Sequence, residues 1–195
     1  MTDPRPRARR YLTPPPQLLV AGLLLAVLAG CASLPEQTLE QPHWQLRGKL
    51  AVLSPRGSGS GQLDWKMTGN QFEITLRGPL GTGAVRLSGS PAAAQLSRGG
   101  ETLSGSFSQL AAPLFGAAVP IEALQHWADG RPAPAPLAAA SQLRYDHRQR
   151  LAGFEQAGWQ ISLSHYNSAT ALPAKLVGRR ADERFTLLVQ SRGGQ

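Results

Sequence analysis

Cysteine is almost missing from this 195-residue sequence, in which it occurs once, as Cys31. A single thiol excludes an intramolecular disulfide. Catalytic and metal-binding patterns are missing too, since the chain has no G-x-S-x-G nucleophile motif and Gly57–Gly61 is not followed by the Lys-Ser or Lys-Thr of a phosphate loop. The histidines lack the short spacings of a zinc site; they are His43, His126, His147 and His165. We therefore expect no enzyme, no metal and no cofactor.

Charged residues and long apolar runs are also scarce. Charged residues make up 16% of the chain, with a net charge of +8, and no basic block alternates with aromatic residues as in a nucleic-acid groove. We expect no nucleic-acid partner; the mild basic charge fits an acidic protein, anionic lipid headgroups or a simply solvated surface. The apolar run from Leu18 to Ala29 would span about 18 Å as a helix, too short to cross a bilayer.

The N-terminus has the pattern of an exported lipoprotein. Arginines at positions 5, 7, 9 and 10 precede the apolar run, which has the length and flanks of a signal-peptide core. The following Leu28-Ala29-Gly30-Cys31 resembles the lipobox of bacterial lipoproteins. We predict that residues 1–30 are a cleaved signal peptide and that Cys31 carries a covalent lipid. The alternative is an ordinary secretory signal that happens to include a cysteine.

The mature chain is predicted to hold one domain behind a tether. Residues 31–42 are polar, include two prolines and show no periodicity, so they form the lipidated N-terminus and a linker. Residues 43–195 are long enough for one domain with its own core. Stable membrane anchoring needs more than one acyl chain, which a triacylated Cys31 would supply.

Apolar residues in the domain alternate with polar ones over most of its length, which predicts antiparallel strands with one apolar face. The strand regions expected are 44–52, 63–67, 72–76, 85–87, around 96 and 103, 142–150, 151–155, 159–163, 172–180 and 185–189. Gly57–Gly61 is predicted to be a flexible loop. Helical spacing predicts a helix through Phe107, Leu110 and Leu114 and a second over Ile121–Asp129 that stops at Gly130.

One turn has an unexpected composition. Residues 78–83 lie between two predicted strands, and Pro79, Leu80 and Gly81 place an aliphatic side chain where Asn, Asp or Ser is usual. Leu80 either folds back onto the sheet or is exposed and enters a membrane or the groove of a partner.

The motifs of the domain, taken in order, resemble the LolB family of outer-membrane lipoprotein receptors. The resemblance covers nearly all of residues 43–190. It rests on Trp44-Gln-Leu-Arg-Gly48, on Trp65 with Phe72 through Gly81, on Pro120 through Gly130, on Gln156-Ala-Gly-Trp159 with Tyr166, and on Leu172-Pro173 with Lys175-Leu176. The chain departs from the family pattern at Leu163, where an aromatic is usual, at Ala174, where a basic residue is common, and at its end, which lacks a terminal Trp. The first two departures could alter the lipid site or a contact with the carrier.

The resemblance implies a mainly β fold with short helices: a strongly curved antiparallel sheet forming an unclosed barrel, with helices that cap an apolar cavity. It implies that the loop with Pro79, Leu80 and Gly81 inserts into the membrane. Candidates for the acyl cavity or its lid are Trp65, Ile74, Leu76, Leu124, Trp127, Trp159 and Ile161. Ordinary core packing is the competing reading of each.

The resemblance also implies partners and a location. A periplasmic LolA-like carrier would deliver acylated lipoproteins, and this protein, a monomer on the periplasmic face of the outer membrane of a Gram-negative bacterium, would insert them into outer-membrane lipid. Ala32 after the cysteine, rather than the Asp of inner-membrane lipoproteins, agrees with that location. Two alternatives remain: a lipid-anchored structural or assembly factor that binds a protein partner, and a lipid-anchored envelope hydrolase.

Overall fold

The structure is a computed structural model that describes residues 42–78, 83–115 and 120–194. Residues 40–195 form a compact unit by themselves. The predicted signal peptide, Cys31 and the linker up to residue 41 lie outside the described residues, as do Pro79, Leu80 and Gly81.

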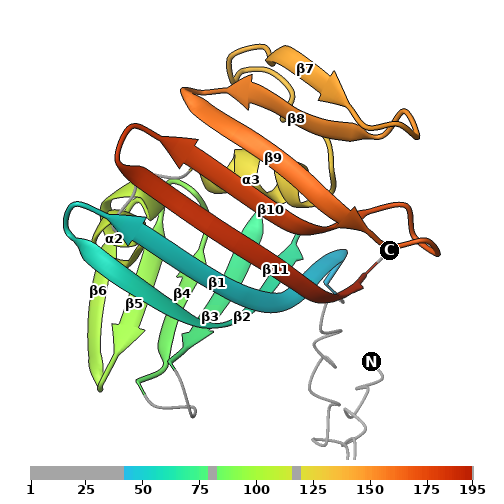
Figure 1. Ribbon diagram of the computed structural model, residues 1–195. Helices are drawn as coiled ribbons and strands as arrows, with labels where there is room; N and C mark the ends of the chain where they lie inside the picture. The colour runs from blue at the N-terminus through green and yellow to red at the C-terminus, as the bar shows by residue number, and fades with distance from the viewer. Residues whose placement is uncertain (1–41, 79–82, 116–119, 195) are drawn as a thin grey trace, which may run out of the picture. The chain divides into compact units, whose positions relative to one another are not determined.

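The described residues form one antiparallel sheet of 11 strands, ordered β6-β5-β4-β3-β2-β1-β11-β10-β9-β8-β7 (Figure 1). The strands are β1 (Trp44–Ser54), β2 (Gly57–Thr68), β3 (Gln71–Arg77), β4 (Val85–Gly89), β5 (Ala94–Arg98), β6 (Glu101–Gly105), β7 (Ser141–Tyr145), β8 (Leu151–Gln156), β9 (Trp159–Tyr166), β10 (Pro173–Arg180) and β11 (Glu183–Gly193). The helices α2 (Phe107–Phe115) and α3 (Ile121–Ala128) separate β6 from β7. The sheet does not close, because β6 and β7 are its two edges.

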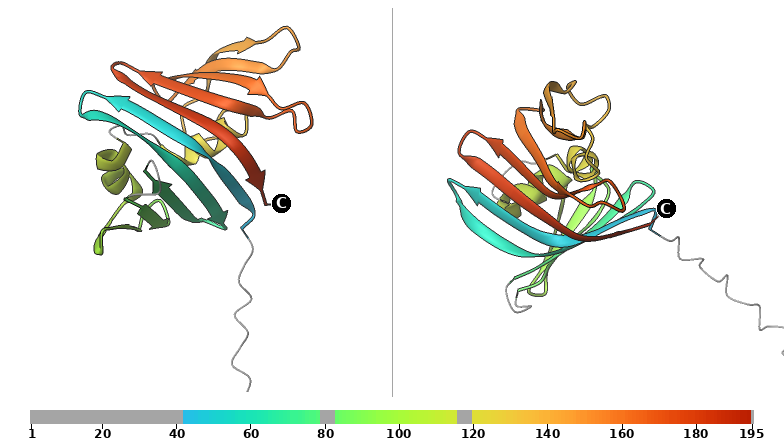
Figure 2. Two further views of the ribbon diagram at one scale, coloured as in Figure 1. Left: turned by 60° about the horizontal axis from the view of Figure 1, so that its bottom comes forward. Right: turned by 45° about the vertical axis from the view of Figure 1, so that its right-hand side comes forward.

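The sheet curves strongly, and both helices lie on its concave side (Figure 2). Alternate residues of the strands other than β6 and β7 point into that side and form the core, as the period-two pattern predicted. In β1, for example, Leu46 and Leu50 are buried while Arg47 and Lys49 are exposed. The predicted fold class, a curved and unclosed mainly β architecture with short helices, is confirmed.

The prediction of a loop at Gly57–Gly61 was wrong, because these residues begin β2. They pair in continuous register with β1, from Ser54 opposite Gly57 to Leu50 opposite Gly61. The chain reverses instead at residues 55 and 56. There the Ser54 hydroxyl donates to the Gly57 carbonyl and accepts from the Arg56 N–H. The small number of side chains had suggested flexibility, but the backbone ladder is complete without them.

The predicted strand at residues 142–150 was too long, since β7 ends at Tyr145. Asp146 makes the turn: its carboxylate accepts from the backbone N–H groups of Arg148 and Arg150 and from the Arg150 guanidinium. The Arg150 side chain and these N–H groups lower the pKa of Asp146 to about 2. A local side-chain network of this kind competes with the strand ladder.

Helix α3 ends as predicted, within one residue. Its last helical residue is Ala128, and Gly130 has a positive φ of 76°, which a glycine adopts without strain. The Trp44 indole donates to the Asp129 carboxylate at 3.0 Å, and the Arg192 guanidinium donates to the Ala128 carbonyl at 2.8 Å. The end of α3 is therefore bound to both β1 and β11.

Candidate functional site

One part of the concave side, the region under α3, is filled. Helix α3 packs there against β8–β11, and we call this region the closed half. The Trp127 ring stacks on Phe185 with centroids 6.5 Å apart, and Trp159 contacts the same ring at 5.2 Å. Trp127 also meets Phe154 edge to face at 6.3 Å. These four aromatic residues are at most 1% exposed, so their side chains form a closely packed part of the core.

A buried amide fixes the segment after α3 to the closed half. Gln156 is 2% exposed, and its Oε1 accepts from the Trp127 indole and from the Ala133 N–H, each at 2.8 Å. Its Nε2 donates to the carbonyls of Ala133 and Ala138 at 2.7 and 2.8 Å. All of these polar groups are satisfied, which makes their burial favourable and gives this half a defined geometry.

The second part of the concave side is a hollow of about 340 Å³ at the end of the sheet where β1 meets β2 and β3 meets the segment before β4. We call it the glycine hollow. Its apolar lining is Leu50 and Val52 of β1, Leu76 of β3 and Val85 of β4. Of these, Val52, Leu76 and Val85 are only partly buried. Apolar side chains therefore face space that no other side chain of the described residues fills.

Glycines in β2 create this space. Gly57, Gly59 and Gly61 share the inward side of β2 with the buried Leu63 and Trp65, because strand residues alternate between faces. A Cβ at Gly59 would have no atom within 4 Å, so it would enter the hollow. A Cβ at Gly61 would lie 2.6 Å from the Arg77 carbonyl oxygen, so this glycine also allows β2 and β3 to approach.

The border of the glycine hollow is basic. Arg56 follows β1, Arg77 ends β3 and Arg98 ends β5, and all three line the hollow and are exposed. The lining described contains no carboxylate. The same end of the sheet is where β3 leads into residues 79–82, the segment with Leu80. An apolar interior with cationic edges fits a ligand that is apolar with a polar or anionic end.

The candidate cavity residues lie in different parts of the core. Trp127, Trp159 and Ile161 are completely buried in the closed half, while Trp65 and Ile74 are paired across β2 and β3 and are at most 4% exposed. Leu124 is partly buried on α3, and Leu76 borders the glycine hollow. As acyl-binding residues, all seven stay predictions. The structure places Trp65, Ile74 and Leu76 on the neighbouring strands β2 and β3, whereas Leu124 and Trp127 are on α3 and Trp159 and Ile161 are on β9.

Sequence reasoning missed Leu50, Val52, Val85 and the three glycines as lining residues. A signal was available in Gly-Ser-Gly-Ser-Gly, because alternation in a strand places every glycine on one face. Of the two positions that depart from the family pattern, Leu163 is buried in β9 opposite Leu176, and Ala174 is partly buried in β10. Neither lines the glycine hollow as described.

Within the described ranges, no group of three or more His, Cys, Asp or Glu side chains could hold a metal ion. No helix of that part of the chain is long and apolar enough to span a bilayer.

These features define a single-domain, mainly β protein of the unclosed-barrel class, with helices on its concave side and an apolar hollow at one end. The family model described as "Outer membrane lipoprotein LolB" matches residues 42–191. The chain belongs to the LolB family, a family of outer-membrane lipoproteins, which confirms the resemblance found in the sequence.

Proteins similar in sequence match this chain over most of their length. The chain is 34% identical to the outer-membrane lipoprotein LolB of Stutzerimonas stutzeri (strain A1501), with 88% of this chain and 93% of that protein covered. Identity to the LolB of Pseudomonas paraeruginosa (strain DSM 24068 / PA7) is also 34%, over 89% and 94% of the two chains. A crystal structure of a LolA superfamily protein from Nitrosomonas europaea matches with a TM-score of 0.47 and 10% identity, over 80% of this chain and 89% of that one.

Proposed function

We propose that this protein is a lipid-anchored receptor on the periplasmic face of the outer membrane. It accepts lipoproteins from a periplasmic carrier of the LolA kind, binds their acyl chains in an apolar cavity and inserts them into the outer membrane. It acts as a monomer, performs no covalent chemistry and is held to the membrane through acylated Cys31. Membership of the LolB family supports this role.

The glycine hollow is the observation that carries the proposal. Its volume of about 340 Å³ lies within the range of ligand pockets, roughly 300–1,000 Å³. Leu50, Val52, Leu76 and Val85 offer apolar contact without hydrogen-bonding demands. Such a lining suits an acyl chain, which has no polar group to recognise along its length.

Burial energy explains why a receptor with an apolar site is needed. Each methylene removed from water contributes about 0.8 kcal/mol, so a triacylated lipoprotein does not leave its carrier for water unaided. A receptor that binds the chains more tightly than the carrier draws the cargo forward, and the bilayer binds them more tightly again. Transfer then proceeds without nucleotide, driven by the order of the affinities.

Release into the bilayer is assigned to the segment with Pro79, Leu80 and Gly81. It follows Arg77 and Gly78, which line the hollow, and it is followed by Gly83, which lines it too. An aliphatic side chain that entered the membrane at this position would bring the opening of the hollow next to the lipid. The acyl chains would then move between two apolar regions with little exposure to water.

A plugging variant tests the acyl site. Gly59→Leu places an isobutyl group in the hollow without a clash at Cβ, whereas Gln62→Leu places a similar group on the opposite face of the same strand, at a residue that does not line the hollow. We expect Gly59→Leu to weaken binding of a fluorescent fatty-acyl probe at least about tenfold, which corresponds to about 1.4 kcal/mol. Gln62→Leu should leave the affinity unchanged. Equal binding by the wild type and both variants would remove the hollow from the proposal.

Photo-crosslinking distinguishes the two parts of the concave side. An acyl probe with a diazirine at the chain end should label the lining of the glycine hollow, and peptide mapping should find adducts at Leu50, Val52, Leu76 or Val85. Adducts at Trp127 or Trp159 would mean that the closed half opens to admit the chain. Absence of adducts from every one of these residues would contradict acyl binding on the concave side.

A further inference from the structure

The outer, convex face of the sheet carries a shallow groove that crosses several strands. Its floor is a row of small or short side chains that are opposite one another in register: Val177 of β10, Thr186 of β11, Ala51 of β1 and Ser60 of β2. Part of it is a hollow of about 600 Å³ that includes Ala51, Ser60 and Thr186 in its lining. We call this feature the convex groove.

One wall of the convex groove is a second row of register partners. It runs through Lys175 of β10, Leu188 of β11, Lys49 of β1, Gln62 of β2 and Arg77 of β3. The three cations stand on every second strand, so their Cα atoms are about 10 Å apart. Lys49, Gln62, Arg77 and Leu188 also line the hollow of about 600 Å³.

The other wall contains Arg179 of β10 and Arg184 of β11, which are direct cross-strand partners and both exposed. Leu53 of β1 continues this wall opposite Arg184 and is 54% exposed. Like charges directly opposite on neighbouring strands disfavour folding. Neither arginine forms an ion pair within the described residues, so nothing there offsets their repulsion. A bound anion would offset the repulsion between these two arginines.

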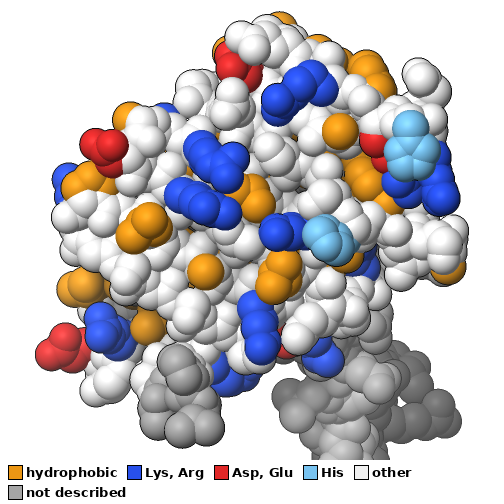
Figure 3. All heavy atoms as spheres, viewed as in Figure 1, with side chains coloured by type: hydrophobic (Ala, Val, Ile, Leu, Met, Phe, Trp, Pro, Cys, Tyr) orange, Lys and Arg blue, Asp and Glu red, His pale blue; other side chains and the backbone are white. Residues whose placement is uncertain are grey.

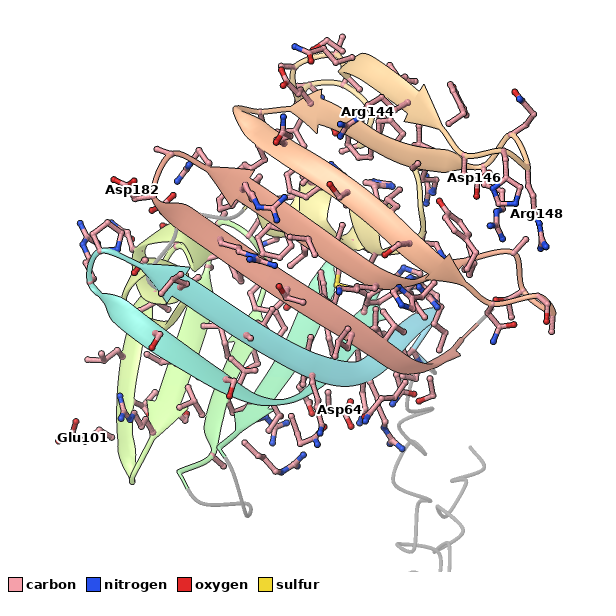
Figure 4. All side chains as sticks on the ribbon, viewed as in Figure 1. Asp64, Glu101, Arg144, Asp146, Arg148 and Asp182 are labelled. Atoms are coloured by element: carbon pink, nitrogen blue, oxygen red, sulfur yellow. The ribbon has the colours of Figure 1, made fainter. Side chains whose placement is uncertain are left out.

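The two walls and the floor of the convex groove, as named above, contain no carboxylate. Along the wall with Arg179, the next strand holds Gln160, and Glu155 comes only on β8. Glu183 is paired with Arg180, and Asp64 is paired with Arg47. Figure 3 shows Lys and Arg side chains across this face, with Asp and Glu toward its margins. Figure 4 labels Asp146 and Asp182, which lie at turns between strands, and Glu101, which begins β6.

We propose that the convex groove is a contact surface for anionic phospholipid headgroups, which orients the domain on the membrane to which it is anchored. Its five cations attract phosphate groups, and the exposed Leu53 and Leu188 lie among them, at 54% and 41% exposure. Cations interleaved with exposed apolar side chains are typical of surfaces that lie in the membrane interface. Arg77 joins this surface to the segment that contains Leu80. The choice of a lipid partner rests on the proposed membrane anchoring.

Vesicle binding tests the proposal with the mature chain carrying Cys31→Ser, so that no lipid anchor contributes. Flotation is measured with vesicles of phosphatidylethanolamine alone and with vesicles that also contain phosphatidylglycerol. Each cation near an anionic surface raises partitioning about fivefold. We expect binding that rises with the phosphatidylglycerol fraction and weakens as NaCl is raised, because salt screens exposed charges.

Single charge reversals locate the contact. Arg184→Glu and Lys49→Glu, on opposite walls, should each lower partitioning into phosphatidylglycerol vesicles at least about fivefold. Arg148→Glu changes the net charge equally at the exposed β7–β8 turn and should leave partitioning nearly unchanged. Equal losses in all three variants would indicate net charge alone, and no loss in the two groove variants would overturn the proposal.

Two further measurements separate this proposal from others. Each variant is also tested for acyl-probe binding, which the convex groove should not affect. If the groove variants keep acyl-probe binding and also bind vesicles as well as the wild type does, the proposed lipid contact is overturned and the proposed function still stands. Wild-type binding to an acidic polypeptide such as polyglutamate, together with no preference for phosphatidylglycerol, would replace the lipid with an acidic protein partner.

Discussion

The closed half and the glycine hollow are built from the same sheet but differ in the size of their inward side chains. In the closed half, Trp127, Phe154, Trp159 and Phe185 fill the space under α3 and are themselves at most 1% exposed. At the glycine hollow, three positions of β2 that face inward have no side chain at all. The first part holds the fold together, and the second is the part that we propose binds acyl chains.

The difference shows how a small sheet can leave space for a ligand without losing its packed core. A core packed to normal density resists any change of volume, so a site cannot be added to it without loss of stability. Glycines that alternate along one strand remove side chains from one face only and keep the hydrogen-bonded ladder. The end of the sheet can then be hollow while its centre stays stable.

The largest expected effect is on the closed half. Phe185→Ala removes the ring against which Trp127 and Trp159 pack, and it should lower the free energy of unfolding by about 3–5 kcal/mol. Val52→Ala, in the partly exposed lining of the glycine hollow, should cost less than about 1 kcal/mol. Urea denaturation followed by tryptophan fluorescence measures both. Equal losses would erase the distinction between a stabilising half and a binding half.

Leu80→Glu tests whether release of cargo can be lost while both the closed half and the glycine hollow stay intact. A carboxylate moved into the bilayer core costs about 2.5–3.5 kcal/mol, so release of cargo into membranes should fall strongly. Folding and acyl-probe binding should be largely intact, because the closed half and the glycine hollow keep their residues. The measurement is delivery of a lipoprotein into vesicles, with Leu80→Ile as the matched control. Normal delivery by Leu80→Glu would show that Leu80 serves only the turn.

Arg184→Glu extends the comparison to the convex face. It replaces the Arg179–Arg184 repulsion with an opposite-charge pair, so the variant should be more stable by about 0.2–1 kcal/mol. The same variant should bind anionic vesicles less well. Thermal unfolding at low and high salt measures the first effect, which should shrink as salt screens the pair. A destabilised variant would mean that Arg184 has a structural partner.

The smallest expected effect is a pH dependence of the free energy of unfolding, which arises from His126 of α3. Burial, and secondarily Arg131, lower the pKa of His126 below its ordinary value of 6.5, although Asp129 acts in the opposite direction. The unfolded chain therefore binds a proton more readily, and stability should fall as the pH drops below about 6.5 toward the lower folded pKa. Urea midpoints at pH 5 and pH 7 test this, and His126→Gln should reduce the difference. An unchanged difference would assign the effect to other groups.

Much of the fold could be predicted because its pattern is local. The alternation of Trp159, Ile161 and Leu163 fixes a strand with one buried face, and Gly130 fixes the end of α3. The limits of β7 could not be read from alternation, because the turn depends on how the Asp146 carboxylate meets backbone N–H groups that follow it.

The site was harder to predict than the fold, for a physical reason. Leu76 and Trp127 are both apolar in sequence, yet Leu76 borders the glycine hollow and Trp127 fills the core, because the outcome depends on distant neighbours. Gly59 was read as flexible, yet its partner Val52 holds it in a strand, and only that pairing turns a missing side chain into a hollow. The cations of the convex groove come from four strands, and their alignment exists only in the register of the sheet.

The most direct test of the central claim is a handover assay. A verified carrier–lipoprotein complex is mixed with the mature chain carrying Cys31→Ser, without nucleotide, and the location of the lipoprotein is followed by affinity capture of each protein. We predict stable transfer onto this protein and markedly slower transfer onto Gly59→Leu. A lipoprotein that stays on an active carrier, while circular dichroism shows this protein to be folded, would contradict the claim.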